Sequence, residues 1–282
     1  MVPIIKPHAL LSLGQKQNLV LVDVRTGPDA RLKYNAAHLK GALYVDLEQD
    51  LANKNASPAD GGRHPLPGIN RFSSLLGQLG IAPESHVVVY DDKYGANAAA
   101  RFWWMLRAAG HTQVQVMDGG YQAAVAVGVP TGAAAETPAA RAPYPFEAWH
   151  LPTADINQTA NAARAAASLV IDVRAPERFR GEKEPIDLVA GHIPGAVNIP
   201  FTTNLDASGF FVPPGQLYTR YRKALCNRKA EDVVVHCGSG VTACHTMLAM
   251  DYAGLGIPQL YVGSWSEWSR NERPVATGIE VP

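Results

Sequence analysis

A cysteine at the junction of an apolar run and a glycine-rich turn is the residue best placed for covalent chemistry. The three valines at 233–235 predict a buried strand that ends at Cys237. Residues 238–242 read Gly-Ser-Gly-Val-Thr, and residues 244–250 predict a helix closed by Gly254. Cys237 is therefore expected at the carboxyl end of a parallel strand, where open α/β sheets bind their ligands.

The turn after Cys237 suits a nucleophile. Its glycines free the backbone amides to converge on one point, and the helix that follows presents its positive end. Both features favour an anion, so we expect the Cys237 thiol to ionise readily and to attack substrates. The competing interpretation is a buried structural cysteine, which is the usual fate of a free cysteine.

Composition narrows the class of protein. The 282 residues suggest about two domains, and 25 basic residues balance 25 acidic ones, so no broad field attracts nucleic acid or an anionic membrane. No apolar run is long enough for a membrane span, and the N-terminus lacks signal-peptide features. Three cysteines without paired spacing predict no metal site and a reducing compartment, with the cytoplasm as the default.

The sequence contains an internal repeat. Four blocks recur in the same order: 19–25 as 169–174, 37–42 as 191–196, 87–91 as 233–237, and 116–121 as 261–265. Strand-like and helix-like stretches alternate in each half, including an expected helix over 96–109. This alternation predicts parallel sheets with helices on both faces.

The repeat predicts the division of the chain and separates chemistry from scaffold. We expect a first domain at 1–132, an Ala- and Pro-rich linker at 133–151, and a catalytic domain at 152–282. Asp91 stands where the second copy has Cys237, so the first domain lacks the nucleophile.

Two loops differ between the copies or lack periodicity. The interval from Arg174 to His192 is five residues longer than its counterpart in the first copy, which makes it a candidate substrate loop. The Gly- and Pro-rich stretch 53–68 carries Arg63 and His64, which could face a cleft, but we expect it to be a solvated loop.

The Cys237 turn and the blocks Gly-His-Ile-Pro-Gly-Ala (191–196) and Gly-Ser-Trp-Ser-Glu-Trp (263–268) resemble the two-domain rhodanese family of sulfurtransferases. The resemblance covers essentially the whole chain. It implies an α/β fold of two tandem rhodanese-like domains, each a parallel five-stranded sheet flanked by helices, with the first domain catalytically silent.

The resemblance also implies a mechanism without a cofactor. Cys237 would take a sulfur atom from a small anionic donor as a persulfide, and cyanide or a thiol such as thioredoxin or glutathione would remove it. The loop would bind the sulfur's negative charge through residues Gly238, Ser239, Gly240, Val241 and Thr242.

Further site residues follow position by position from the family pattern. Arg178 matches the arginine that binds the donor's anionic group, and His38 and Asp29 match first-domain residues proposed to face the cysteine. His38 is mirrored by His192 in the second copy, which favours a structural turn residue. Arg25 and Arg174 are likewise mirrored, so we expect them to bond within their own domains.

Two observations bear on the donor, and they conflict. Thiosulfate enzymes of the family usually carry basic residues in the loop, where this chain has Gly238 and Ser239, and a neutral loop favours 3-mercaptopyruvate. Many mercaptopyruvate enzymes carry a second arginine at the position of Asp187, which cannot bind a carboxylate. We expect 3-mercaptopyruvate, with thiosulfate as the alternative donor.

Other functions explain the sequence less well. A phosphatase of the same fold needs an arginine six residues after the cysteine, where this chain has Ala243. A persulfide carrier that serves a protein partner without turnover remains an alternative. A disulfide between Cys237 and Cys244 is disfavoured by two turns of helix, and Cys244 is expected in the core. Trp265 and Trp268 could line the mouth of a cleft, but we expect them to pack the core. For His236 and His245 we expect a core or surface role and not catalysis, since no carboxylate is evident beside them.

Overall fold

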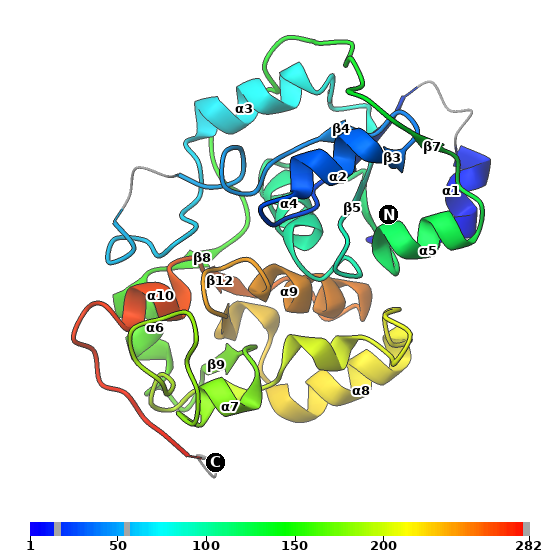
Figure 1. Ribbon diagram of the computed structural model, residues 1–282. Coiled ribbons are helices and arrows are strands. Elements are labelled where there is room, and N and C mark those ends of the chain that lie inside the picture. The colour runs from blue at the N-terminus through cyan, green and yellow to red at the C-terminus, as the bar shows by residue number, and fades with distance from the viewer. Residues whose placement is uncertain (14–17, 54–56, 279–282) are drawn as a thin grey trace. The chain divides into compact units, whose positions relative to one another are not determined.

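A computed structural model describes residues 1–13, 18–53 and 57–278, and the chain forms two compact units (Figure 1). The first unit comprises 1–52, 67–150 and 207–211, and the second comprises 53–66, 151–206 and 212–282. Each unit therefore takes a short segment from the other half of the sequence. The domain limits at 132 and 152 stay predictions.

The first unit is a parallel sheet with helices. Its elements are β1 (Ile4–Ile5), α1 (Pro7–Leu13), β2 (Leu19–Asp23), α2 (Ala30–Ala36), β3 (His38–Leu39), β4 (Leu43–Tyr44), α3 (Ile69–Gln78), β5 (His86–Tyr90), α4 (Ala98–Ala108), β6 (Val114–Met117), α5 (Gly120–Ala126) and β7 (Thr131–Gly132). Five strands pair in the order β1-β6-β5-β2-β4, all parallel, while β3 and β7 form a separate antiparallel pair.

The second unit repeats this plan. Its elements are β8 (Thr153–Ala154), α6 (Ile156–Ala162), β9 (Leu169–Asp172), α7 (Pro176–Phe179), β10 (Val197–Asn198), the 3₁₀ turn η1 (Phe201–Asn204), α8 (Pro214–Leu225), the 3₁₀ turn η2 (Ala230–Asp232), β11 (Val233–His236), α9 (Ala243–Tyr252), β12 (Gln259–Tyr261) and α10 (Ser264–Trp268). The strands are parallel in the order β10-β9-β11-β12-β8, which read from β8 corresponds strand by strand to the order of the first sheet. This confirms the predicted pair of five-stranded α/β domains.

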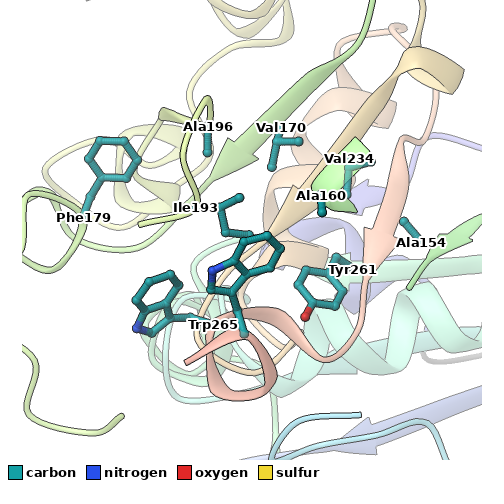
Figure 2. Packing of buried hydrophobic residues seen from close by; sticks show 10 residues of the cluster. Ala154, Ala160, Val170, Phe179, Ile193, Ala196, Val234, Tyr261 and Trp265 are labelled. Atoms are coloured by element: carbon teal, nitrogen blue, oxygen red, sulfur yellow. The ribbon is translucent and has the colours of Figure 1, made fainter. Parts of the chain in front are cut away.

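Continuous apolar runs place the central strands in the interior. In the second unit, Val170 and Val234 lie against Trp265 and Tyr261 in one cluster of buried side chains (Figure 2). Both tryptophans of α10 are buried, as predicted, and their ring nitrogens donate to main-chain carbonyls: Trp265 to Val189 and Trp268 to Pro274, each at 2.9 Å. The indoles therefore pack the core with their polar atoms satisfied.

The mirrored arginines have matching structural roles. Arg25 binds Asp23 and the carbonyl of Ala37 and lies over the ring of Tyr121. In the second unit Arg174 binds Asp172 and the carbonyl of Gly191 and lies over Trp265. Each guanidinium is 4.4 Å from its aromatic ring, so the prediction that these arginines bond within their own domains is confirmed.

The predicted linker is anchored to the first unit by aromatic side chains. Tyr144 is buried, and its main chain exchanges hydrogen bonds with Ser73. Phe146 and Trp149 both pack against Phe72, with ring centroids 6.1 and 5.5 Å away. These contacts hold a segment of irregular backbone in one place.

Candidate active site

Cys237 directly follows β11, the central strand of its sheet, and its side chain is buried at 2 % exposure. Its main chain is fixed by α10: the amide donates to Ser264 Oγ at 3.2 Å, and the carbonyl accepts from Trp265 at 3.0 Å. The carbonyl of Gly238 accepts from Ser266 at 2.9 Å. Consequently the carbonyls at the start of the turn point to α10, which holds the conformation of the turn.

The turn presents amides to an anion. In the described part of the chain, no hydrogen-bond acceptor faces the amides of Gly238, Ser239, Val241 and Thr242. Gly240 adopts φ +73°, and a Cβ there would lie 2.5 Å from the carbonyl oxygen of Val262, so the turn requires glycine. The ten-residue helix α9 begins directly afterwards and adds the positive end of its dipole.

Residues 61–64 contact this turn and α10, which corrects the expectation of a solvated loop. His64 Nδ1 lies 2.7 Å from Ser239 Oγ. The main chain is held by α10 as well: Arg63 N donates to Ser266 Oγ at 3.0 Å, and Gly61 N donates to Glu267 at 3.1 Å. From the sequence, a solvated loop is the favoured interpretation over a cleft for Arg63 and His64, because their partners lie 124–203 residues away and leave no local pattern in the sequence. A long loop without periodicity was the available signal, since such loops often carry function.

Two guanidinium groups lie beside Gly238, the residue that follows Cys237. A Cβ built on Gly238 would be 3.2 Å from Arg63 Nη2 and 3.6 Å from Arg178 Nη2. Gly238 therefore permits an approach that a larger residue would obstruct. The turn itself is neutral, and the positive charge comes from these two side chains.

The extra residues of the second copy hold those arginines. Glu184 accepts two bonds from Arg178, at 2.7 and 3.0 Å, and Asp187 accepts a further one at 3.3 Å. Asp187 also binds Arg63 and, at 3.0 Å, Arg270. Thus Asp187 does not leave the site short of a second arginine, because it positions Arg63 beside Gly238.

Glu184 is ionised by these contacts. Burial acts to raise its pKa, but the bond from Arg178 and the amides of Asp187 and Ile186 outweigh burial and hold that pKa below its usual range. The loop therefore presents fixed negative charge to the arginines at neutral pH.

Cys244 is buried, as predicted, and its thiol contacts the carbonyl of Gly240 at 3.3 Å; the two histidines that flank the turn, His236 and His245, are buried as well. The expectation that no carboxylate lies beside them was wrong for His236, whose Nε2 is 3.7 Å from Asp172. Burial, with help from the charge of Arg174, lowers the pKa of His236 although Asp172 opposes the shift. His236 is therefore neutral at neutral pH and belongs to the core.

Of the two first-domain candidates, His38 has partners within its own unit and Asp29 is exposed. His38 Nδ1 lies 2.8 Å from the carbonyl oxygen of Tyr34, and its ring stacks on the same tyrosine at 4.2 Å. His192 in the second unit repeats this contact with Phe179, at 2.8 and 3.7 Å. Asp29 is exposed at the start of α2, without a side-chain bond to the helix.

Asp91 closes the equivalent turn of the first unit. Its Oδ1 accepts from the amides of Lys93 and Gly95 at 2.9 and 2.8 Å. Its Oδ2 accepts from Asn97 and Ala99 at 3.1 and 3.2 Å. Burial raises the pKa of this carboxyl, and the four amide donors act against that shift. A carboxylate here binds the amides with which such a turn could hold an external anion.

Within the part of the chain that the structure describes, no helix is long and apolar enough to cross a membrane. Nor do three or more His, Cys, Asp or Glu side chains from residues 1–13, 18–53 and 57–278 gather in a way that could hold a metal ion.

Comparisons with known proteins identify the family of this chain. The model of the rhodanese-like domain matches residues 6–126 and again 153–271. A probable 3-mercaptopyruvate sulfurtransferase of Pseudomonas aeruginosa is 43% identical over 253 residues, covering 87% of this chain and 86% of the relative. The human 3-mercaptopyruvate sulfurtransferase is 37% identical and covers 95% and 90%. A thiosulfate sulfurtransferase of Gallus gallus is 34% identical and covers 87% and 83%.

A solved structure of the 3-mercaptopyruvate sulfurtransferase from Leishmania major superposes with a TM-score of 0.83 at 29% identity, covering 96% of this chain and 75% of that one. The chain belongs to the rhodanese-like family and carries its domain twice. It is an enzyme of the sulfurtransferase class.

Proposed function

We propose that this enzyme moves a sulfur atom from 3-mercaptopyruvate to cyanide or a thiol through a persulfide on Cys237. One observation carries the proposal: Cys237 follows a strand end, the amides of Gly238, Ser239, Val241 and Thr242 have no acceptor in the described part of the chain, and two guanidinium groups adjoin the turn. The amides suit a sulfur anion, and the guanidinium groups suit the carboxylate of the donor.

In the first step the Cys237 thiolate attacks the sulfur of the donor. A sulfur–sulfur bond forms and the carbon–sulfur bond breaks, leaving its electron pair on pyruvate enolate. The enolate takes up a proton to give pyruvate, and the persulfide releases one on ionisation. In the second step cyanide, or a thiol such as thioredoxin or glutathione, attacks the outer sulfur and restores the thiolate.

The neighbouring residues have distinct roles in this scheme. Arg178 and Arg63 bind the carboxylate end of the donor, while Glu184 and Asp187 keep both guanidinium groups oriented. Ser239, within hydrogen-bond distance of His64, passes a proton to or from the donor as the carbon–sulfur bond breaks. The first domain takes no part in the covalent step, because Asp91 occupies its amides.

Thiosulfate is the second candidate donor. The same two guanidinium groups suit a dianion, and a relative from Gallus gallus bears the name thiosulfate sulfurtransferase. The turn itself contributes no charged side chain, which favours the keto acid.

Steady-state kinetics with cyanide as acceptor test the proposal. We expect kcat/KM for 3-mercaptopyruvate to exceed that for thiosulfate clearly, and donor-treated protein without acceptor to gain one sulfur atom on the peptide that contains Cys237. A clear excess for thiosulfate would reject the donor but keep the persulfide. Turnover without added mass on that peptide would reject the persulfide.

A further inference from the structure

A cavity lies in the second unit beside the start of β9, whereas Cys237 follows the opposite, carboxyl end of the neighbouring strand β11. Its volume is about 720 Å³, and it is bordered by the ends of α6 and α8 and by the start of β9. Leu169 in its wall pairs with Val233, the first residue of β11, whereas Cys237 follows the last residue of that strand. The volume is typical of sites for small organic molecules.

The wall of this cavity carries four cations and no carboxylate: Arg164, Arg220, Lys223 and Arg228. Within the described residues none of the four forms an ion pair. Arg220 and Lys223 are three residues apart on α8, so they lie on one face of the helix. The result is a concentration of positive charge in a protein whose formal net charge is zero.

One of these cations is fixed in place. Arg228 Nη2 donates to the carbonyl of Ala166 at 2.6 Å, and Nη1 donates to the carbonyl of Leu225 at 3.4 Å. Its Nε is buried and has no acceptor among the described residues, so the guanidinium retains a donor for a ligand.

Stabilisation of helix ends does not account for the whole arrangement. Cations near the last turn of α8 favour the helix dipole, and Arg228 bonds to a carbonyl there. That role accounts for Lys223 in the last turn of α8 and for Arg164 just after the end of α6, but not for Arg220, which lies before the last turn of α8 and has no charged partner in the described structure.

The remaining lining is mainly apolar and includes Leu169, Val197, Ile199 and Ala224. A phosphate or sulfate ion alone would leave these side chains uncovered. We propose that this cavity binds a small organic anion with an apolar body and at least two acidic groups. The apolar lining takes the body, and the four cations take the carboxylates, sulfonates or phosphates.

Calorimetry on the full chain tests the site, with 1,5-naphthalenedisulfonate as the probe. We expect one probe to bind per chain, about tenfold or more weakly after Arg220→Glu with Lys223→Glu. The matched control is Arg222→Glu with Lys229→Glu, which makes the same change in net charge at positions outside the cavity. The control is expected to retain the affinity. Equal weakening in both pairs, or no saturable binding, would overturn the proposal.

Cys226 gives an independent readout of position, because it lines the cavity and is exposed. The bound probe should slow alkylation of Cys226 by iodoacetamide severalfold, as measured on its peptide by mass spectrometry. Neutral 1,5-dihydroxynaphthalene at the same concentration should leave the rate of Cys226 alkylation unchanged. If the probe instead protects only Cys237, it binds in the active site and the proposal fails.

Discussion

The turns after β5 and β11 occupy equivalent places in two sheets of the same strand order, yet their amides have different partners. In the first turn, four amides donate to the carboxylate of Asp91. In the second turn, Cys237 replaces the aspartate, and the amides of Gly238, Ser239, Val241 and Thr242 lack an acceptor within the described chain.

One side chain therefore decides whether the amides of this backbone arrangement are satisfied internally or stay available to an external group. A built-in carboxylate satisfies the amides of the first turn and stabilises it. Without that carboxylate, the second turn can bind the charge of an external group, which is the arrangement that stabilises developing anions in enzymes. Predictions that exchange or remove these groups test the comparison directly.

The largest effect is expected at Cys237. Cys237→Ser should reduce sulfur transfer by more than about a thousandfold, because the hydroxyl cannot form a persulfide. Cys244→Ser, seven residues further on, is the matched control and should alter kcat/KM little, since its thiol is buried in the core. Steady-state rates and thermal unfolding of both variants measure this. Comparable activity in Cys237→Ser would remove the residue from the mechanism.

The first turn should respond in stability. Asp91→Ala leaves up to four amides without an acceptor, of which those of Gly95 and Ala99 are buried, and we expect the free energy of unfolding to fall by about 2–4 kcal/mol. Asp91→Asn keeps one acceptor oxygen, so its free energy of unfolding should fall by less than that of Asp91→Ala. Denaturant titration measures both changes. A loss below about 0.5 kcal/mol in Asp91→Ala would mean that the carboxylate is not what holds this turn.

The arginines beside Gly238 should affect the donor. Arg63→Ala and Arg178→Ala should each raise KM for 3-mercaptopyruvate about tenfold or more, since a bond to a charged group contributes about 1.5–3 kcal/mol. Arg180→Ala is the control, because Arg180 is paired with Glu182 away from the turn. An unchanged KM in Arg63→Ala would leave Arg178 as the sole described anchor for the carboxylate.

The smallest effect concerns pH. The folded pKa of His236 lies below its ordinary value of 6.5 because the ring is buried, so below pH 6.5 the unfolded chain binds a proton that the folded chain does not. Stability is therefore complete above pH 6.5 and falls as the pH drops from there toward the folded pKa. The slope from this group is at most about 1.4 kcal/mol per pH unit. His236→Asn should flatten the decline of unfolding free energy between pH 7 and 5. An unchanged slope would mean that another group controls it.

The duplicated sheets could be predicted because each central strand is formed by a short apolar run, and these runs recur in the same order in both halves of the sequence. Cys237 could be predicted from the strand end and the glycine-rich turn after it, whereas Arg178 could be assigned only through the resemblance to the family. Arg63 could not, since its position depends on Asp187, more than a hundred residues away. Neither Asp187 as a support for arginines nor the buried partner of His236 leaves a local pattern in the sequence.

The exchange of short segments between the units has a consequence for synthesis of the chain. The first unit includes Phe211, whose amide donates to Asp118, and the second includes Arg63, whose amide bonds to Ser266. Ribosomes add about 5–20 residues per second, so Arg63 is made roughly 10–40 seconds before Ser266. Neither unit can complete its contacts while only its own half of the chain has emerged, and the contact between Arg63 and Ser266 forms only after residue 266 has been made.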